Sequence, residues 1–313
     1  MRAYRPALEV PGDLEAFWQA SLGEARRHDL DARFTPVDSG LSVISTFDVQ
    51  FAGYAGSPVR GWLHLPAGVA RPLPVVVEYV GYGGGRGLAH ERLLWSAAGY
   101  AHLTMDTRGQ GSTWSVGDTP DPDPTGAPHH PGFTTAGILD PATYYYRRVY
   151  VDAARAIEAV RTHPEVDPGR VAVTGRSQGG ALAIAAASLI PDVAAVLPDV
   201  PFMSDLPRSI TKTETDPYAE IARYLKAHRD HVEQALRTLS FFDAAILGRW
   251  AKAPALFSVG LMDLICLPST VFAAYNWYGG PKEIREYPFN DHEGGEAFHE
   301  LASLRWLAPR LAR

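Results

Sequence analysis

The sequence predicts an α/β fold with a mostly parallel, twisted sheet and helices on both of its faces. Short runs of β-branched or apolar residues alternate with helical stretches along most of the chain. These runs are apolar throughout, which is typical of parallel strands that are buried on both faces. The chain has 313 residues, of which 46% are hydrophobic, enough for a sizeable core. We expect one domain over residues 1–313, with an N-terminal extension at 1–40 and an insertion at about 201–240.

The first expected part of the sheet is an antiparallel hairpin. Residues 43–51 and 58–65 alternate in polarity and flank a glycine-containing reversal at 53–57, the pattern of two strands joined by a tight turn. The later strands are expected to be parallel because helical stretches separate them. They are predicted at residues 74–79, 101–105, 171–174, 193–197, 255–259 and 284–288.

Helices and loops are expected between these strands. Apolar residues at three- and four-residue spacing predict a helix over 144–162, and the alanine-rich run 181–190 predicts a buried helix. Five prolines between Gly117 and Gly137 indicate an ordered surface loop. The polar, helical section 201–238 interrupts the rhythm of strands and is a candidate lid or oligomer contact.

Composition and charge argue against several classes of function. The chain carries 29 basic and 35 acidic residues, a net charge of −6, and no basic stripe, so nucleic acid is not the expected partner. The apolar run 181–190 has half the length of a membrane span. The first residues lack the apolar core of a secretion signal, and we expect a cytoplasmic protein. Cys266 is the only cysteine, which excludes an intrachain disulfide and a four-cysteine zinc site.

A candidate nucleophile lies in the pattern glycine, arginine, serine, glutamine, glycine at residues 175–179. The pattern follows a predicted strand and opens a predicted helix, the context of a nucleophile elbow. Glycines permit the tight turn that exposes the hydroxyl of Ser177, and free N–H groups at the start of the helix favour developing negative charge. A serine that only caps the helix is the alternative.

A serine nucleophile requires a base and an acid that orients the base. In α/β-hydrolases they follow in the order serine, acid, histidine. His292 is the predicted base because it lies in a turn-rich loop after the last predicted strand. Among the other histidines after Ser177, His228 and His231 lie in a charged helical section, and His299 is expected on the final helix.

Asp263 is the predicted acid because it directly follows the strand at 255–259. Loops at the carboxyl ends of such strands line the ligand crevice of an open α/β sheet. Asp291 is adjacent to His292 and would face away from it, and Asp243 precedes the strand and would lie at the opposite end. The alternative for Asp263 is a turn residue that caps a helix starting near Pro268.

Acyl transfer also needs hydrogen-bond donors for the oxyanion. The backbone N–H of Gln178 is one donor by construction of the elbow. The N–H of Tyr82, in the glycine-rich loop 81–87 that follows a strand, is the second candidate. This loop does not fit the G-x-G-x-x-G pattern of dinucleotide-binding proteins, and no Gly-Lys pair is present for a P-loop.

Other short patterns are better explained without catalysis. Ser209 begins an S-x-x-K sequence, but the companion S-D-N and K-T-G sequences are missing. His292 and Glu293 do not continue into the H-E-x-x-H motif of metalloproteases. The pair His129 and His130 is expected to be exposed or at an interface. Cys266 is expected to line the pocket as a small apolar group. We therefore predict no metal and no cofactor.

A resemblance to a known family is carried by residues 108–111, 137–148, 175–180, 268–276 and 292–293. The chain is similar to carbohydrate esterase family 7, the acetyl xylan esterases and cephalosporin C deacetylases, from Phe17 onwards. The resemblance implies an α/β-hydrolase with Ser177 as nucleophile, Asp263 as acid and His292 as base, and with the N–H groups of Tyr82 and Gln178 as the oxyanion hole.

In that family an Arg-Gly-Gln element braces the active-site region, and it maps to Arg108, Gly109 and Gln110. Arg108 could instead simply pair with a carboxylate. Two departures concern the pocket. Val80 and Gly83 stand where the family commonly has histidine and asparagine, and the residues around His292 are also less typical.

The resemblance implies an esterase that removes acetyl groups from acetylated xylo-oligosaccharides and other small acetate esters such as cephalosporin C, through an acetyl-serine intermediate. It also implies a homo-oligomer, a ring-shaped hexamer, with contacts expected at 43–65 and 201–238. Two alternatives stay open. One is an α/β-hydrolase for longer acyl esters or peptides, and the other is a non-catalytic hydrolase-fold binding protein.

Overall fold

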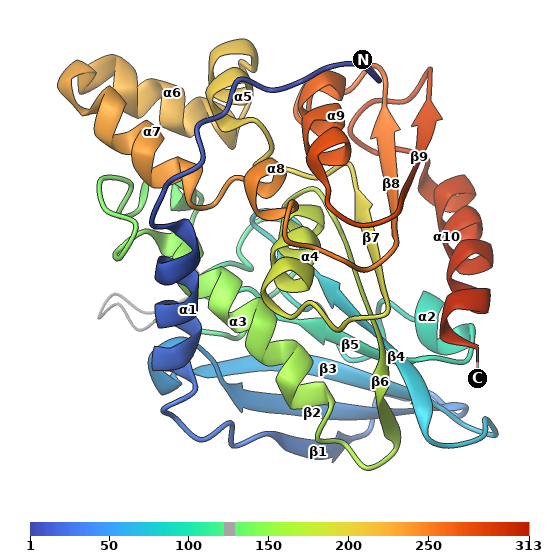
Figure 1. Cartoon of the computed structure of the whole chain (residues 1–313). Coiled ribbons are helices and arrows are strands. Elements are labelled where there is room, and N and C mark those ends of the chain that lie inside the picture. Colours follow the sequence, from blue (N-terminus) through green and yellow to red (C-terminus); the bar gives the residue numbers. More distant parts are fainter. Residues whose placement is uncertain (122–128, 313) are drawn as a thin grey trace.

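The computed structural model of the chain describes residues 1–121 and 129–312 (Figure 1). Within this part of the chain the strands form a nine-stranded sheet in the order β1-β2-β3-β5-β4-β6-β7-β8-β9. Strands β4 to β9 run parallel to one another, whereas β1, β2 and β3 add to the sheet in antiparallel pairs. The predicted α/β class with a mostly parallel sheet is confirmed.

The antiparallel part of the sheet comes from the N-terminal residues. The predicted hairpin consists of β2 (Ile44–Ala52) and β3 (Pro58–Pro66), and β3 then pairs with β5. The sequence did not predict β1 (Arg33–Val37), which lies inside the expected extension and pairs with β2. It is largely exposed and contains Pro36, features that suit an edge strand and leave no clear alternation in the sequence.

The parallel strands agree with the predicted runs to within a few residues, except that β6 begins earlier. Its first residue, Val166, pairs with Leu73 before the apolar run starts. The bounds are β4 (Leu73–Tyr79), β5 (Ala101–Met105), β6 (Val166–Arg176), β7 (Ala195–Asp199), β8 (Ala255–Gly260) and β9 (Lys282–Tyr287).

Helices cover both faces of the sheet. The strand residues Val75 and Val77 belong to the larger core, which contains side chains of α3 (Tyr145–Val160) and α4 (Gln178–Leu189). Val76 between them belongs to a smaller core under α2 (Leu94–Ala97) and α10 (Glu296–Leu311). Figure 1 shows the two helix layers on opposite sides of the sheet. Because both faces are covered, successive residues of the central strands are buried and the strands contain continuous apolar runs.

The N-terminal helix α1 (Leu14–Ala25) packs into the larger core. The ring of Trp18 stacks on Tyr150 of α3, and its Nε1 donates to the carbonyl oxygen of Phe241 at 3.0 Å. The short helices η1 (Tyr54–Gly56) and η2 (Phe133–Thr135) and helix α9 (Pro268–Trp277) complete this side. Residues 122–128 of the predicted proline-rich loop lie outside the described residues.

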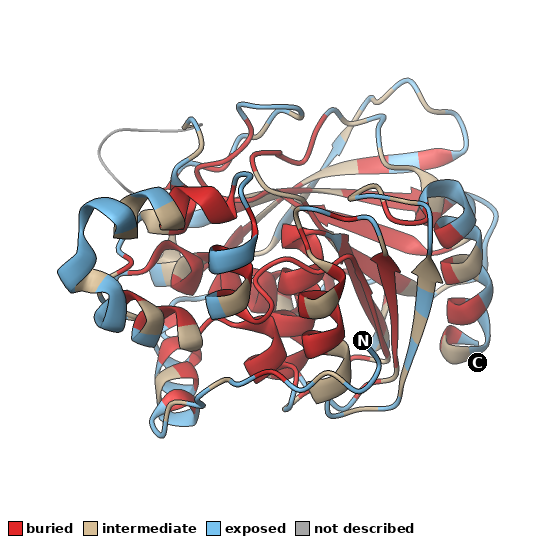
Figure 2. Ribbon diagram, turned by 90° about the horizontal axis from the view of Figure 1, so that it is seen from above, coloured by how far each residue is buried: buried red, intermediate tan, exposed pale blue. Residues whose placement is uncertain are grey.

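The predicted helical insertion lies between β7 and β8. Figure 2 shows that its outer helices are largely exposed, but the first turn of α6, residues 218–221, is buried. The insertion therefore reaches the body of the protein through the start of α6. Its elements are α5 (Leu206–Lys212), α6 (Tyr218–Ala227), η3 (Arg229–His231), α7 (Val232–Ser240) and α8 (Ala244–Leu247).

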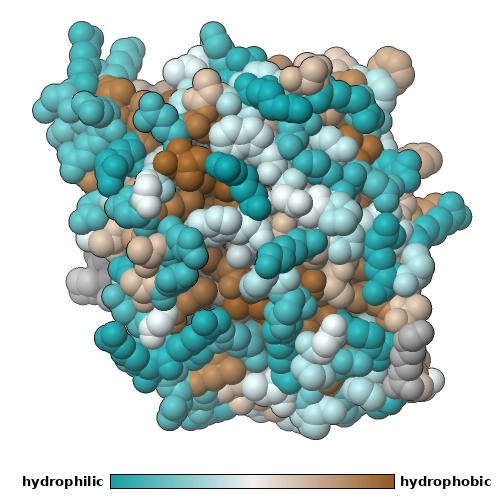
Figure 3. Space-filling view, in the orientation of Figure 1, coloured by the Kyte–Doolittle hydropathy of each residue, from teal (hydrophilic) through white to brown (hydrophobic). Residues whose placement is uncertain are grey.

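Apolar side chains on the face drawn in Figure 3 are scattered among hydrophilic ones. Over residues 1–121 and 129–312, none of the helices combines the length and the apolar character needed to cross a membrane.

Candidate active site

Ser177 occupies the sharp turn between β6 and α4, as the glycine pattern predicted. Its backbone has φ 57° and ψ −116°, a conformation that costs energy in a non-glycine residue. The turn is held by a hydrogen bond from the Ser177 N–H to the carbonyl oxygen of Asp199 at 2.9 Å. A Cβ on Gly179 would collide with the carbonyl oxygen of Tyr79 at the end of β4. Glycine is therefore required for the elbow to approach β4.

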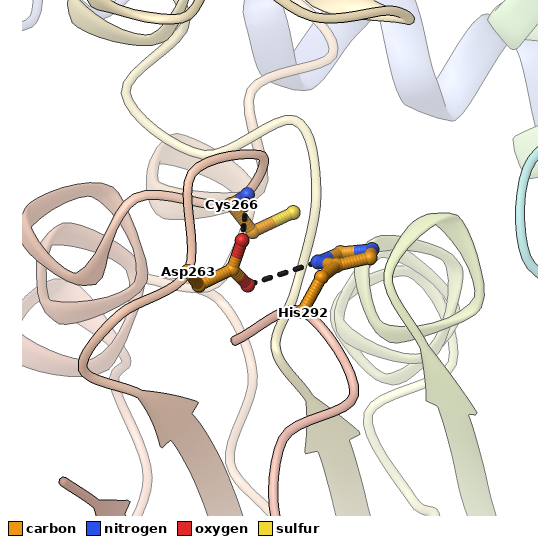
Figure 4. Close-up of side chains that lie close together, drawn as sticks. All are labelled: Asp263, Cys266 and His292. Atoms are coloured by element: carbon orange, nitrogen blue, oxygen red, sulfur yellow. Dashed lines mark hydrogen bonds and ion pairs between the residues drawn. The ribbon is translucent and has the colours of Figure 1, made fainter. Parts of the chain in front are cut away.

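Asp263 and His292 come from the loops after β8 and β9, and their side chains meet (Figure 4). The Nδ1 atom of His292 lies 2.9 Å from Oδ2 of Asp263. The other carboxylate oxygen of Asp263 accepts hydrogen bonds from the N–H groups of Ile265 at 2.8 Å and Cys266 at 2.9 Å. Asp263 is buried, whereas the His292 side chain is 26% exposed. The pair has the geometry of an acid that orients a partly accessible base.

The other histidines after Ser177 lie elsewhere or have other partners. The rings of His228 and His231 stack on each other in the insertion, and Nδ1 of His231 lies 2.8 Å from the hydroxyl of Tyr224. His299 is on α10, as predicted, and its Nδ1 lies 3.1 Å from the hydroxyl of Tyr287. Burial lowers the pKa of His299. None of these three rings is bonded to Asp263.

The alternative acids also have structural roles. The side chain of Asp291 accepts the N–H of His292 at 2.8 Å and so faces its own loop. Asp243 caps α8 by accepting the N–H of Ala245 at 2.9 Å. Asp263 is thus the carboxylate that the structure brings to His292.

The two candidate oxyanion donors lie at the ends of neighbouring strands. Gln178 is the first residue of α4 after β6, and its N–H is one that a helix leaves without an internal partner. Tyr82 lies in the loop after β4, which pairs directly with β6. The side chain of Gln178 donates to the carbonyl oxygen of Val80 at 3.1 Å. This bond ties the elbow to the loop that carries Tyr82.

Gln110 of the Arg-Gly-Gln element is bonded to both segments that carry the candidate oxyanion donors. Its Oε1 accepts the N–H of Gly83 at 2.7 Å, and its Nε2 donates to Oε1 of Gln178 at 2.9 Å and to the hydroxyl of Tyr145 at 3.0 Å. The hydroxyl of Tyr146 also donates to Oε1 of Gln178 at 2.9 Å. All these side chains are buried, so this part of the site is held by a closed hydrogen-bond network.

Arg108 is fully buried and pairs with a carboxylate, the alternative that the sequence left open. Its guanidinium donates to both oxygens of Asp152 on α3, at 2.5 and 2.8 Å. The hydroxyl of Tyr145 donates to the carbonyl oxygen of Arg108 at 2.5 Å. Gly109 has φ 73°, a left-handed conformation that glycine adopts without strain. Arg108 and Gly109 therefore fix the backbone that presents Gln110.

The structure gives a local reason for the glycine at position 83. Gly83 has φ 77°, and a Cβ there would collide with Oγ1 of Thr113. The same hydroxyl donates to the carbonyl oxygen of Gly83 at 2.8 Å. Thr113 thus takes the space that a side chain at position 83 would need. Val80 is buried and belongs to the apolar interior.

A cavity of about 770 Å³ opens at the carboxyl edge of the sheet. Ser177, Tyr82 and His292 all line it, which brings the candidate nucleophile, base and oxyanion loop to one space. The other walls come from the loop after β5, from the residues before α6, and from α2 and α10. Lining residues include Trp114, His130, Pro131, Arg176, Asp216, Pro217, Ile265 and His299.

Asp263, Cys266 and His292 offer the closest set of metal-ligating atoms among the described residues, all within 4.8 Å of one another. Asp263 and His292 are already bonded to each other. Burial and the nearby Asp263 carboxylate raise the pKa of the Cys266 thiol well above its ordinary value, which disfavours the thiolate that a metal requires. The set is better explained as an acid-base pair with a neutral thiol beside it (Figure 4).

Three further residues support this site and were not predicted from the sequence. Asp152 holds Arg108, Tyr146 holds Gln178, and Glu220 accepts a hydrogen bond from the hydroxyl of Tyr82. Asp152 gave one usable signal, because it is the one acidic residue among the buried residues of α3. Ser209, the first residue of the S-x-x-K sequence, is buried and donates to the carbonyl oxygen of Ser204 at 2.8 Å.

A strained serine turn at the end of a parallel strand, with a carboxylate and histidine from two later strand ends, defines an α/β-hydrolase. Comparison with known proteins narrows this class. The family model for acetyl xylan esterase (AXE1) matches residues 1–310. The chain therefore belongs to the acetyl xylan esterase family and is a carboxylic ester hydrolase, as the resemblance predicted.

Two solved structures agree with this assignment. An acetyl xylan esterase from a Paenibacillus species is 41% identical, with a TM-score of 0.91 over 98% of both chains. Acetyl xylan esterase 1 from a Thermoanaerobacterium species is 30% identical, with a TM-score of 0.90 over 99% of this chain and 98% of that one. The acetyl esterase Axe7A of Xylanibacter ruminicola is 27% identical over 290 residues, 92% of this chain. This chain spans 65% of the length of Axe7A.

Proposed function

We propose that this protein is a serine esterase that removes acetyl groups from acetylated xylo-oligosaccharides and other small acetate esters such as cephalosporin C. The observation that carries the proposal is the hydrogen bond from His292 to Asp263 beside a cavity that Ser177 also lines. The relatives described as acetyl xylan esterases support the acetyl group and the xylan-derived alcohol.

The reaction proceeds through an acetyl-serine intermediate. His292 uses Nδ1 for Asp263, which leaves Nε2 to take the proton of Ser177 as the hydroxyl oxygen attacks the acetyl carbonyl carbon. The carbonyl oxygen becomes an oxyanion that accepts hydrogen bonds from the N–H groups of Tyr82 and Gln178. The alcohol leaves with the proton from His292. Water, deprotonated by His292, then attacks the acetyl-serine and releases acetate and free Ser177.

Arg108, Gly109 and Gln110 support this reaction without contacting the substrate. Gln110 bonds the N–H of Gly83 and the side chain of Gln178, so it sets the separation of the two proposed oxyanion donors. Such donors are effective only when they are fixed before the charge develops.

The same proposal includes the organisation of the protein. It comprises a single domain over residues 1–313, with an extension at 1–40 and an insertion at about 201–240, acting in the cytoplasm without a nucleic-acid or membrane partner. By the example of the family it assembles as a homo-oligomer, a hexamer, in which the β2–β3 hairpin and the insertion are the proposed contacts. Size-exclusion chromatography with light scattering tests the assembly.

Initial rates on the p-nitrophenyl esters of acetate, butyrate and octanoate, with Ser177→Ala beside the wild type, test the activity. We expect acetate to be hydrolysed fastest and Ser177→Ala to lose at least about ten-thousandfold in kcat. Acetylated xylo-oligosaccharides and cephalosporin C are then the next substrates.

Each other outcome selects a different explanation. Faster hydrolysis of octanoate would replace the acetyl specificity with the longer-acyl alternative and keep the nucleophile. Full activity of Ser177→Ala would remove the nucleophile assignment itself. A wild type without activity on any ester would favour the non-catalytic binding protein.

A further inference from the structure

The phenol of Tyr82 is bound to the helical insertion. Its hydroxyl donates to the carboxylate of Glu220, with both oxygens at 2.8 Å. The same hydroxyl oxygen accepts the N–H groups of Gly132 at 3.2 Å and Phe133 at 3.0 Å. Glu220 lies 138 residues further along the chain, in the buried first turn of α6. The residue that carries one proposed oxyanion donor is thus attached to an element outside the catalytic sheet.

Glu220 is a buried carboxylate whose observed partners are neutral. It is 8% exposed, and Oε2 accepts the hydroxyl of Thr134 at 2.5 Å in addition to the phenol of Tyr82. Arg223, on the next turn of α6, pairs with Asp216 at 2.7 Å. Burying a charge among neutral donors costs free energy, so a residue with this environment deserves a functional explanation besides the packing of a helix.

Position 82 is held at three points, and only one of them involves the insertion. Its carbonyl oxygen accepts the indole N–H of Trp114 at 2.9 Å. The next N–H, of Gly83, is bonded to Gln110. The third point is the bond from the phenol to Glu220. Two main-chain bonds hold the loop at position 82. The phenol is held by Glu220 and by the N–H groups of Gly132 and Phe133, so a shift of the ring would move the backbone that carries the Tyr82 N–H.

The insertion also forms part of the cavity wall. Asp216 and Pro217, directly before α6, line the cavity that contains Ser177. The hydroxyl of Thr134 lies 3.4 Å from the carbonyl oxygen of Pro217 and so connects the same loop to this wall. A bound alcohol group that contacts the wall is therefore connected to Tyr82 through the start of α6.

We propose that Glu220 is a positioning residue, which holds Tyr82 so that its N–H points at the oxyanion and which couples the insertion to acyl transfer. The inference rests on the proposed esterase function. Loss of one oxyanion donor costs about a hundred- to a thousandfold in rate, and a donor that is present but misdirected is expected to cost part of that.

The test compares Glu220→Ala, Glu220→Gln, Tyr82→Phe and the double variant Tyr82→Phe with Glu220→Ala, using p-nitrophenyl acetate. We expect kcat to fall about 30-fold in Glu220→Ala and about tenfold in Tyr82→Phe, with KM changed by less than about threefold. Glu220→Gln keeps an acceptor for the phenol and should recover most of the rate. The double variant should be no slower than Glu220→Ala alone, because the two side chains act through the same hydrogen bond, whereas independent effects would multiply to about 300-fold.

Thr134→Val is the matched control, because it removes a hydrogen bond to the same carboxylate and leaves the phenol bond in place. Its melting temperature should fall while kcat stays near that of the wild type. Equal kcat losses in Thr134→Val and Glu220→Ala would show that Glu220 only anchors the insertion and would overturn the proposal. Wild-type kcat in a folded Tyr82→Phe would overturn it as well.

The rate of inactivation by diethyl p-nitrophenyl phosphate separates this inference from the proposed function. Phosphorylation of Ser177 needs the nucleophile and the oxyanion donors but no acetyl specificity. A wild type that prefers another acyl group should still react with the reagent, and Glu220→Ala should react about tenfold or more slowly. Equal inactivation rates for wild type and Glu220→Ala would refute the positioning role even then.

Discussion

The loop after β4, which carries the proposed oxyanion donor Tyr82, and the loops that carry Asp263 and His292 meet at one cavity but are held in different ways. Gln110 and Gln178 tie the oxyanion loop to the elbow through a buried network. On the other side, the His292 ring is held through Asp263, and the neighbouring Leu264 and Phe289 are exposed. A main-chain N–H group cannot move independently of the residues beside it, so the loop and the turn that carry the proposed oxyanion donors must be fixed before the reaction. A base that serves two proton transfers tolerates small movements.

The largest expected effect is at His292, on the side of the cavity formed by the loops that carry Asp263 and His292. His292→Ala should lower kcat by at least about ten-thousandfold, because it removes the proposed base, the ring that is bonded to Asp263. The melting temperature should change by no more than about 2 °C, because the ring is partly exposed and lies on a loop. Steady-state rates and thermal unfolding check both expectations. His228→Ala, in the exposed part of the insertion, is the control and should retain full activity.

A stability loss in His292→Ala as large as that of a core variant would contradict the distinction between the two sides. It would mean that the acid-base loops also contribute to the packing of the fold.

Gln110→Ala should affect both activity and stability. Removal of this buried amide leaves the N–H of Gly83 without its partner and takes one hydrogen-bond partner from the side chain of Gln178, which keeps its bonds to Val80 and Tyr146. We expect a loss of about 2–4 kcal/mol in the free energy of unfolding and a drop of about 10- to 100-fold in kcat. Chemical denaturation and steady-state kinetics on the same preparation measure both.

Ser209→Ala provides the comparison for Gln110→Ala, because Ser209 is also buried and hydrogen-bonded but lies in the insertion. It should lose stability and keep kcat. If Gln110→Ala behaved in the same way, the network would stabilise the fold without positioning the proposed donors.

The pH dependence of stability should depend on Tyr82, in the loop after β4. Burial raises the pKa of Tyr82 above its ordinary value, as does the nearby Glu220 carboxylate. A raised pKa means that the unfolded chain loses this proton first, so the stabilising contribution of Tyr82 is complete below about pH 10 and declines above it. Tyr82→Phe lacks that contribution. We expect it to be about 1–2 kcal/mol less stable at pH 8.

The difference between Tyr82→Phe and the wild type should shrink as the pH rises from 10 to 11. Urea denaturation at three pH values measures it, and the other buried tyrosines are common to both proteins and cancel. A difference that stays constant up to pH 11 would contradict the assigned environment of the phenol.

The smallest effect is expected at Cys266, which lies next to Asp263 in the loop after β8. Since burial raises the pKa of its thiol, it is neutral at working pH and does not compete with Ser177 as a nucleophile. Cys266→Ala should keep kcat within about threefold of the wild type, which is within the range of a small packing change. A hundredfold loss would assign the thiol a direct part in the reaction.

The sequence predicted those parts of the fold that leave a local pattern. Apolar runs located the parallel strands, and alternation located the hairpin, because burial on two faces or one determines which residues each strand contains. The strand β1 was missed because it is an exposed edge strand with Pro36. Its position depends on pairing with β2, which no local pattern records.

The candidate site divides in the same way. Glycines mark the elbow, and strand ends locate Asp263 and His292, so these were predictable from order and context. Glu220 and Asp152 were not, because their partners Tyr82 and Arg108 are 138 and 44 residues away in the chain. A long-range hydrogen bond between polar side chains leaves no periodic signal. Only the folded arrangement shows which carboxylate is needed.

The contact of Gly179 with the end of β4 has a consequence for protein engineering. Any side chain at this position would push the turn that carries Ser177, the proposed nucleophile, away from the end of β4. Mutagenesis libraries that seek a wider range of esters should therefore leave residues 175–179 unchanged. Ile265 and Pro131 line the cavity from loops that supply neither nucleophile nor oxyanion donor. A library that varies these two positions together is the better choice, because selection then acts on the shape of the cavity while the turn at Ser177 keeps its geometry.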